Sequence, residues 1–190
     1  MSRSYRISVR ECVNRVIRAE DRVSTNLEML EVLPPEQMAA LLGDELERRG
    51  FRREGGGTLV RRGQGVTVTV DPAKGAVTVA AETREDLNLE GQKDGRTYDE
   101  AGQHARRMKE SLREELRRDL EKKASEKEAG LQTKVTDRLE AQLGGLRQEL
   151  DEAVNRVTAE ALKRKAAQLG QIKEITEDPQ AGSLTIVVEV

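Results

Sequence analysis

The chain has few residues of the kinds that build catalytic and metal centres. Of its 190 residues, one is cysteine and one is histidine, and tryptophan is absent. Cys12 therefore has no partner for a disulfide within the chain, and no cysteine metal cluster can form. His104 has no second histidine or cysteine close in sequence, so neither zinc binding nor a nucleophilic relay is indicated. These absences predict a protein that is not an enzyme and holds no metal or other cofactor.

Aromatic residues and long apolar runs are also scarce. Aromatic side chains make up 2% of the chain, so a core has to be built from Val, Leu, Ile, Ala and Met. No run approaches the roughly 18 apolar residues of a membrane span, and the first residues lack the apolar segment of a signal peptide. We therefore expect a cytoplasmic protein without a membrane segment, and a single cysteine fits a reducing compartment.

Charge is abundant but balanced. The chain has 33 Lys and Arg against 35 Asp and Glu, a net charge of -2, so it has no bulk attraction for nucleic acid. Arginines recur along the first predicted strand, but acidic residues are interleaved with them, and aromatic residues that could stack on bases are few. That combination favours ion pairs between strands over a nucleic-acid surface. The glycine clusters at residues 55–57 and 63–65 lack phosphate-loop spacing and are interpreted as turns.

The longest periodic stretch is residues 98–169, where apolar residues recur three or four apart and proline is absent. This pattern predicts one long amphipathic helix or two shorter ones. Between residues 139 and 157 the steps alternate between four and three, which is the seam of a coiled coil. The stripe is narrow, so its partner is either the other half of the same stretch or a second molecule. The predicted interaction residues of this seam are Leu139, Leu143, Leu146, Leu150 and Val157.

The first 83 residues predict a β-rich α+β module. Alternation from Tyr5 indicates a strand, and two apolar segments around residues 20–22 favour a hairpin. Pro35 at a first helical position and Gly50 after the last predict a helix between them. Residues 66–70 and 76–80 alternate on either side of an Asp-Pro-Ala-Lys-Gly turn and predict paired strands. Residues 84–97 are polar without a clear period, and we interpret them as a connector.

The last residues, 171–190, predict a second β-hairpin with its turn at residues 178–182. A lone two-stranded hairpin is marginal in water, so we expect it to join the N-terminal sheet. That return requires the helical stretch to fold back, and Gly130 is the predicted tip. The predicted fold class is therefore α+β: a small antiparallel sheet with one short helix, a long antiparallel helical hairpin (coiled coil) over residues 98–169, and a C-terminal β-hairpin returning to the sheet.

Two segments carry a resemblance to known families. Residues 66–80 (VTVTVDPAKGAVTVA) and 166–190 (AAQLGQIKEITEDPQAGSLTIVVEV) resemble small proteins of the Ycf35-like (DUF1257) and DUF2997 families. The resemblance covers the two hairpins and the helix ends, and the long helical stretch departs from the shorter pattern of those families. It implies an accessory protein encoded beside an AAA-type ATPase, including bacterial conflict systems. No catalytic residue is implied.

The function that these observations favour is a non-enzymatic adaptor or accessory protein. It would bind a protein partner, with an AAA-type ATPase as the candidate, through its helical hairpin and sheet. A different class stays open as an alternative, namely a structural self-assembling coiled-coil protein whose seam pairs between chains as a homo-oligomer. Neither nucleic acid nor a membrane is a predicted partner.

Overall fold

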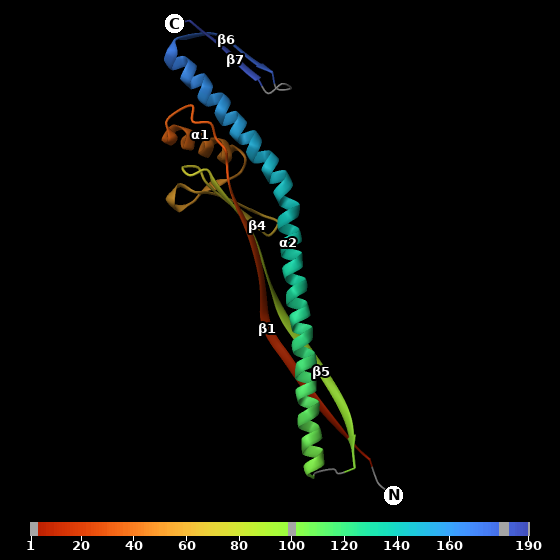
Figure 1. The fold of residues 1–190 in the computed structure, drawn as a ribbon. Helices are drawn as coiled ribbons and strands as arrows, with labels where there is room; N and C mark the ends of the chain where they lie inside the picture. The colour runs from red at the N-terminus through yellow and green to blue at the C-terminus, as the bar shows by residue number, and fades with distance from the viewer. Residues whose placement is uncertain (1–3, 99–101, 179–182, 190) are drawn as a thin grey trace. The chain divides into compact units, whose positions relative to one another are not determined.

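The fold is α+β (Figure 1). The described residues form a five-stranded sheet, two α-helices and a separate two-stranded sheet. The computed structural model describes residues 4–98, 102–178 and 183–189. The larger sheet has the strand order β1-β5-β4-β3-β2. The elements are β1 (Tyr5–Asn26), α1 (Pro35–Arg48), β2 (Arg52–Arg53), a 3₁₀ turn η1 (Gly55–Gly57), β3 (Leu59–Gly63), β4 (Val66–Asp71), β5 (Ala76–Thr97), α2 (Gln103–Leu169), β6 (Gln171–Asp178) and β7 (Ser183–Glu189).

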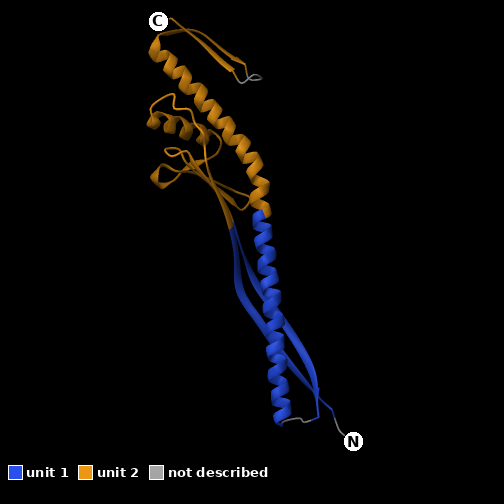
Figure 2. Ribbon diagram, viewed as in Figure 1, with its two compact units in different colours: residues 1–20, 82–136 blue, residues 21–81, 137–190 orange. Residues whose placement is uncertain are grey.

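The chain divides into two compact units, shown in different colours in Figure 2. Unit 1 consists of residues 1–20 and 82–136, and unit 2 of residues 21–81 and 137–190. The elements β1, β5 and α2 each contribute residues to both units.

Unit 1 is a two-stranded ribbon of β1 and β5 backed on one face by α2. Alternation along β1 turns Val9 and Val13 toward the helix, where they pack with Leu116 and Leu120. The apolar positions of α2 here, from Leu112 to Leu120 and on to Ala124, recur every four residues. Because a helix turns about 100° per residue, each such step moves the stripe about 40° round the helix. A stripe that rotates in this way can follow the twist of a two-stranded ribbon.

Unit 2 contains the elements with the strongest local sequence signals, and these predictions are confirmed. Helix α1 begins at Pro35 and buries an apolar stripe that includes Leu42 and Leu46, and the chain leaves it through Gly50 with a φ of 88°. Strands β4 and β5 pair around the predicted turn, in register from Val70↔Val77 to Val66↔Ala81. Residues 55–57 form the 3₁₀ turn η1, and Gln64 and Gly65 form the turn between β3 and β4, while Gly63, predicted as part of that turn, is the last residue of β3.

Two predictions for the strands are wrong. Strand β1 runs without interruption for 22 residues, so the polar residues 20–22 lie inside it and do not form a hairpin. Residues 84–97 are the second half of β5, also 22 residues long, and not a connector. Both errors have the same cause. One face of this ribbon lies in water and its covered face is partly glycine and threonine, so the two segments contain few apolar residues and lack a clear alternating pattern.

The predicted helical hairpin is also wrong. Helix α2 is a single helix of 67 residues that continues through Gly130. A glycine inside a helix costs about 1 kcal/mol relative to alanine, which is too little to break it when the residues on both sides favour helix and bury an apolar stripe. The start predicted at Tyr98 lies partly outside the described residues, because residues 99–101 are not described.

The C-terminal hairpin forms as predicted but does not return to the larger sheet. Strands β6 and β7 pair with each other in a sheet of their own. Of the turn predicted at residues 178–182, Asp178 is the last residue of β6, and residues 179–182 lie outside the described residues. A bulge between Ile172 and Glu174 brings Ile172 and Ile175 to the same face, opposite Val188 and Ile186. Because the helix before it does not fold back, the reason for expecting a return to the sheet is gone.

Candidate functional site

The seam predicted as an interaction surface is filled by the chain itself. Leu139, Leu146, Leu150 and Val157 are all buried in unit 2, and Leu143 is half-buried. Leu143, Leu146 and Leu150 lie over Val77 and Val79 of β5, which with Val66 and Val68 form the covered face of the sheet. The partner of the seam is therefore a β-sheet of the same chain, where the sequence predicted a second helix.

A network of charged side chains holds α1 and β3 of unit 2 against α2. Arg61 donates from both terminal nitrogens to the Glu149 carboxylate, over 2.6 and 2.7 Å, and its guanidinium carbon lies 4.5 Å from the centre of the Phe51 ring. Arg49 donates to the buried Glu45 at 2.8 Å and to the backbone oxygen of Glu149 at 3.0 Å. The hydrogen bond from Arg61 lowers the pKa of Glu149. These contacts explain the placement of α1, and they hold structure together rather than form a reactive site.

In unit 1, two glycines of β5 allow α2 to lie close to the ribbon. A Cβ added at Gly91 would meet Leu116 Cδ1 at 2.7 Å, and one at Gly95 would meet Leu112 Cδ1 at 2.9 Å. A gap of four residues on β5 keeps both glycines on one face. The polar character of residues 84–97 hid this face from sequence reasoning, because glycine adds nothing to an apolar period.

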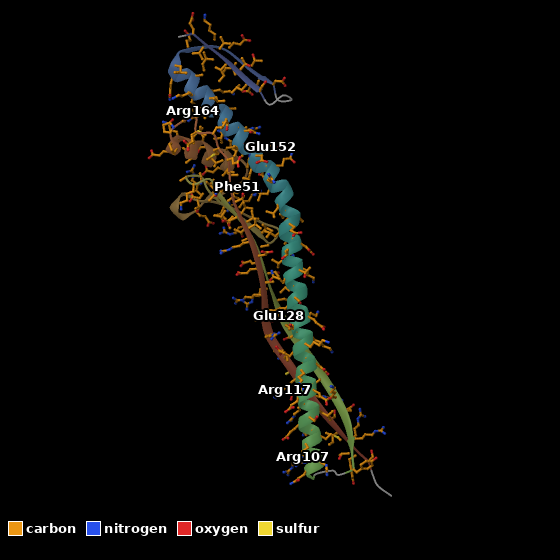
Figure 3. The ribbon with its side chains drawn as sticks, in the orientation of Figure 1. Phe51, Arg107, Arg117, Glu128, Glu152 and Arg164 are labelled. Atoms are coloured by element: carbon orange, nitrogen blue, oxygen red, sulfur yellow. The ribbon has the colours of Figure 1, made fainter. Side chains whose placement is uncertain are left out.

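The β1 side of the ribbon is joined to α2 by matched charges. Glu11 lies 3.7 Å from both Arg113 and Arg117. Arg15 pairs with Glu121 at 2.8 Å and Glu128 at 3.1 Å. Arg117 and Glu128, both labelled in Figure 3, belong to this side of the helix. Each charge that β1 directs toward the helix thus meets opposite charges there.

On the β5 side of the ribbon, the ion pairs with α2 among the described residues are those of Lys93. Lys93 pairs with Asp119 at 2.9 Å and with Glu115 at 3.2 Å, and these hydrogen bonds raise the pKa of Lys93 and lower that of Asp119. Farther along α2, Lys123 lies four residues after Asp119, Lys127 four residues after Lys123, and Lys134 seven residues after Lys127. These three residues form the lysine flank. Within the part of the chain that the structure describes, none of these three forms an ion pair or a hydrogen bond.

The lysine flank borders a groove of about 340 Å³ on the surface of unit 1. Its walls include Glu85 and Leu89 from β5, and the buried Leu131 from α2. Beside this groove β5 has an open edge, because pairing with β4 ends at Ala81 and, among the described strands, only β1 lies next to β5 beyond that residue. An open strand edge next to lysines that form no ion pair with the described residues is the arrangement in unit 1 that is best suited to binding another chain.

The residues considered for chemistry are not brought together. Cys12 is exposed on β1, beside Arg10 and Glu90, and His104 is exposed in the first turn of α2. Over residues 4–98, 102–178 and 183–189, no group of three or more His, Cys, Asp or Glu side chains could hold a metal ion. Asp94 lies on the outer face of the ribbon, where hydrogen bonds from Arg6, Ser8 and Gln92 lower its pKa to about 2. That shift reflects pairing between strands.

In the comparison with protein families, the matching model covers the whole chain. The model of the FtsH ternary system domain X5 family matches residues 1–190. The chain belongs to this family. Its name describes a domain of an FtsH-associated system, which agrees with the coarser expectation of an accessory protein beside an AAA-type ATPase, although it is not the family that the two hairpins resemble. No curated protein and no solved structure matches the chain. Neither described helix has a stretch long and apolar enough to cross a bilayer.

Proposed function

We propose that this chain is a non-enzymatic accessory protein of an FtsH-type system, and that it binds the AAA-type protease of that system through its sheet and α2. The observation that carries the proposal is the family match, which extends from residue 1 to residue 190. The matched length covers both units, so the proposal concerns the whole fold and not one segment of it.

The geometry of unit 1 supports a binding role. Helix α2 covers one face of the ribbon, and the other face presents polar side chains joined by hydrogen bonds, such as Arg10 to Gln92 at 2.9 Å. A ribbon backed on one side by a long helix has a stable backbone and two edges along which a partner can align. This scaffold provides surfaces suited to binding.

The direct test is binding between the full chain and the detergent-solubilised FtsH-type protease from the same cell. We expect association in biolayer interferometry, a change in the rate at which the protease degrades an unfolded model substrate, and no ATP hydrolysis or proteolysis by the chain alone. A chain that recovers only itself from the native host, even after crosslinking, would refute the proposal. Turnover of nucleotide or peptide by the chain alone would refute its non-enzymatic part.

Self-assembly through the helical seam would need a seam that is free to contact a second chain. A seam that lies on the sheet of its own chain presents no free stripe to a second copy. We therefore expect light scattering to report a monomer of 21.2 kDa. A stable dimer that dissociates on Leu143→Asp while the protomer stays folded would restore the self-assembling alternative.

A further inference from the structure

We propose that the open edge of β5 in unit 1, together with the lysine flank, binds an extended acidic segment of a protein partner as an added strand. The proposal deepens the proposed function and rests on it, because it assigns the binding to one edge and states the chemistry of the partner. It follows from three features of unit 1: an unpaired strand edge, a contrast in charge matching between the two sides of the ribbon, and the spacing of the lysines.

The strand edge is available over most of the second half of β5. Strand β4 pairs with β5 only from Asp71↔Ala76 to Val66↔Ala81. From residue 82 to residue 97, β5 therefore has β1 on one side and no strand on the other, as far as the described residues extend. Its outward N–H and C=O groups can form a complete antiparallel or parallel ladder with a peptide.

The lysine flank beside that edge has no ion pair among the described residues, in contrast to the charges on the other side. Asp119, whose pKa is lowered mainly by its hydrogen bond from Lys93, is also attracted at longer range by Lys123. On the β1 side, Glu11 and Arg15 each meet two opposite charges on α2. On the β5 side, Lys93 also meets two, but the lysine flank meets none within 4 Å among the residues that the structure describes. Ion pairs thus join α2 to β1 and to Lys93 of β5, whereas the lysine flank of α2 forms none with the described residues. Opposite charge supplied by a partner would complete the pattern.

Two glutamates also belong to the groove and limit the choice of partner. Glu85 and Glu126 line it with the three lysines, so its local charge is one positive unit, from three lysines less two glutamates. Nucleic acid and anionic lipid present dense, regular negative charge, which these two carboxylates repel, and the groove has no aromatic side chain on which a base could stack. A peptide can place its carboxylates beside the lysines and its uncharged residues beside the glutamates, so a peptide fits better.

The spacing of the lysines suits a strand. Lys123 and Lys127 are four residues apart on the helix, or about 6 Å, close to the roughly 6.8 Å between residues i and i+2 of a strand. Lys134 lies about 10.5 Å farther on, between the distances to i+2 and i+4 of a strand, and within reach of a flexible lysine side chain. An added strand with acidic residues at alternate positions would direct them all toward α2, because alternate side chains share one face.

The test uses the full chain and a fluorescent peptide of about a dozen residues in which glutamate alternates with valine or threonine. The same peptide with lysine for glutamate, a DNA duplex, and vesicles of phosphatidylglycerol serve as comparison probes. The test variant is the charge reversal of the lysine flank, Lys123→Glu, Lys127→Glu and Lys134→Glu. The matched control reverses three exposed cations of α2 outside the groove, Arg107→Glu, Lys109→Glu and Lys122→Glu; Arg107 is labelled in Figure 3. Circular dichroism checks that both variants keep their helix.

We expect the acidic peptide to bind, the test variant to bind it about tenfold more weakly or worse, and the control to stay within about twofold. Bound peptide should slow hydrogen exchange of backbone amides in residues 82–97. Equal weakening in both variants would show a response to net charge alone and overturn the proposal. Tighter binding of DNA or vesicles than of the peptide, or no change in exchange along β5, would also overturn it.

The same variants separate this proposal from the proposed function. If the protease binds the wild type and the test variant equally, the edge of β5 is not the site and the accessory role stands. If the protease does not bind at all but the acidic peptide binds and protects β5, the proposed peptide-binding groove is supported and the proposed accessory role is refuted.

Discussion

Replacing either partner of the Arg61–Glu149 pair in unit 2 should reveal how strongly β3 is held to α2. The two charged groups share two hydrogen bonds of 2.6 and 2.7 Å, and their side chains are 31% and 27% exposed. A pair at this depth lies between exposed pairs, which contribute about 0.2–1 kcal/mol, and buried pairs, whose disruption costs about 3–5 kcal/mol. We therefore expect a coupling energy of about 1–2 kcal/mol in a double-mutant cycle of Arg61→Ala and Glu149→Ala.

The two single variants should not be equal. Arg61 also lies over the Phe51 ring and donates to the backbone oxygen of Arg49 at 3.3 Å, contacts that Glu149→Ala leaves in place. We expect Arg61→Ala to lower the free energy of unfolding by about 2–3 kcal/mol and Glu149→Ala by about 1–2 kcal/mol. Urea denaturation followed by circular dichroism measures both. A coupling energy indistinguishable from zero would refute the view that this pair joins β3 to α2.

The pH dependence follows from the pKa shift. The hydrogen bond from Arg61 lowers the pKa of Glu149 in the folded state, so its stabilising contribution is complete above the unfolded glutamate value of about 4.3 and is lost as pH falls through the lower, folded value. The difference in stability between wild type and Glu149→Gln should therefore be constant near neutral pH and shrink below about pH 4. A difference that grows on acidification would show that the sign of this argument is wrong.

Three further predictions concern packing. Gly91→Val should destabilise the chain by about 1–3 kcal/mol, measured by urea denaturation, because its side chain would enter space held by a leucine of α2; an unchanged midpoint would refute this close approach. Leu150→Asp should cost a few kcal/mol in the same assay and the same change at exposed Gln148 almost nothing, and equal effects would contradict the burial of the seam. Removing residues 171–190 should leave hydrogen-exchange protection at Val68 unchanged, since the hairpin is a separate sheet; lost protection would mean that it supports the larger one.

The sequence alone determined the elements whose signals are local. Helix α1 was predictable because Pro35 suits a first helical turn and Gly50 takes the positive φ that ends one. The hairpin of β4 and β5 was predictable because the Asp71 side chain accepts hydrogen bonds from the next turn residues and the flanks alternate. Each of these signals acts within a few residues, so it does not depend on what the rest of the chain does.

The period of α2 was likewise visible, but its partner was not. A stripe of leucines shows which face of a helix is buried, and the coiled-coil spacing from Leu139 to Val157 is also compatible with a sheet. Gly130 was ambiguous for the same reason, since a glycine permits a break and does not require one. Only the tertiary structure decided that the stripe lies on β-strands and that the helix continues.

The candidate site depended even more on the tertiary structure. Gly91 and Gly95 look like connector residues in the sequence, and they become part of a packed face only because α2 lies against them. The lysines at 123, 127 and 134 look like ordinary exposed charges of a helix. They are distinctive because Glu11 and Arg15 on the opposite strand form ion pairs with α2, whereas these three form none with the described residues. Local sequence determines backbone preference and which face is apolar, whereas charge matching and strand edges depend on which distant segments become neighbours.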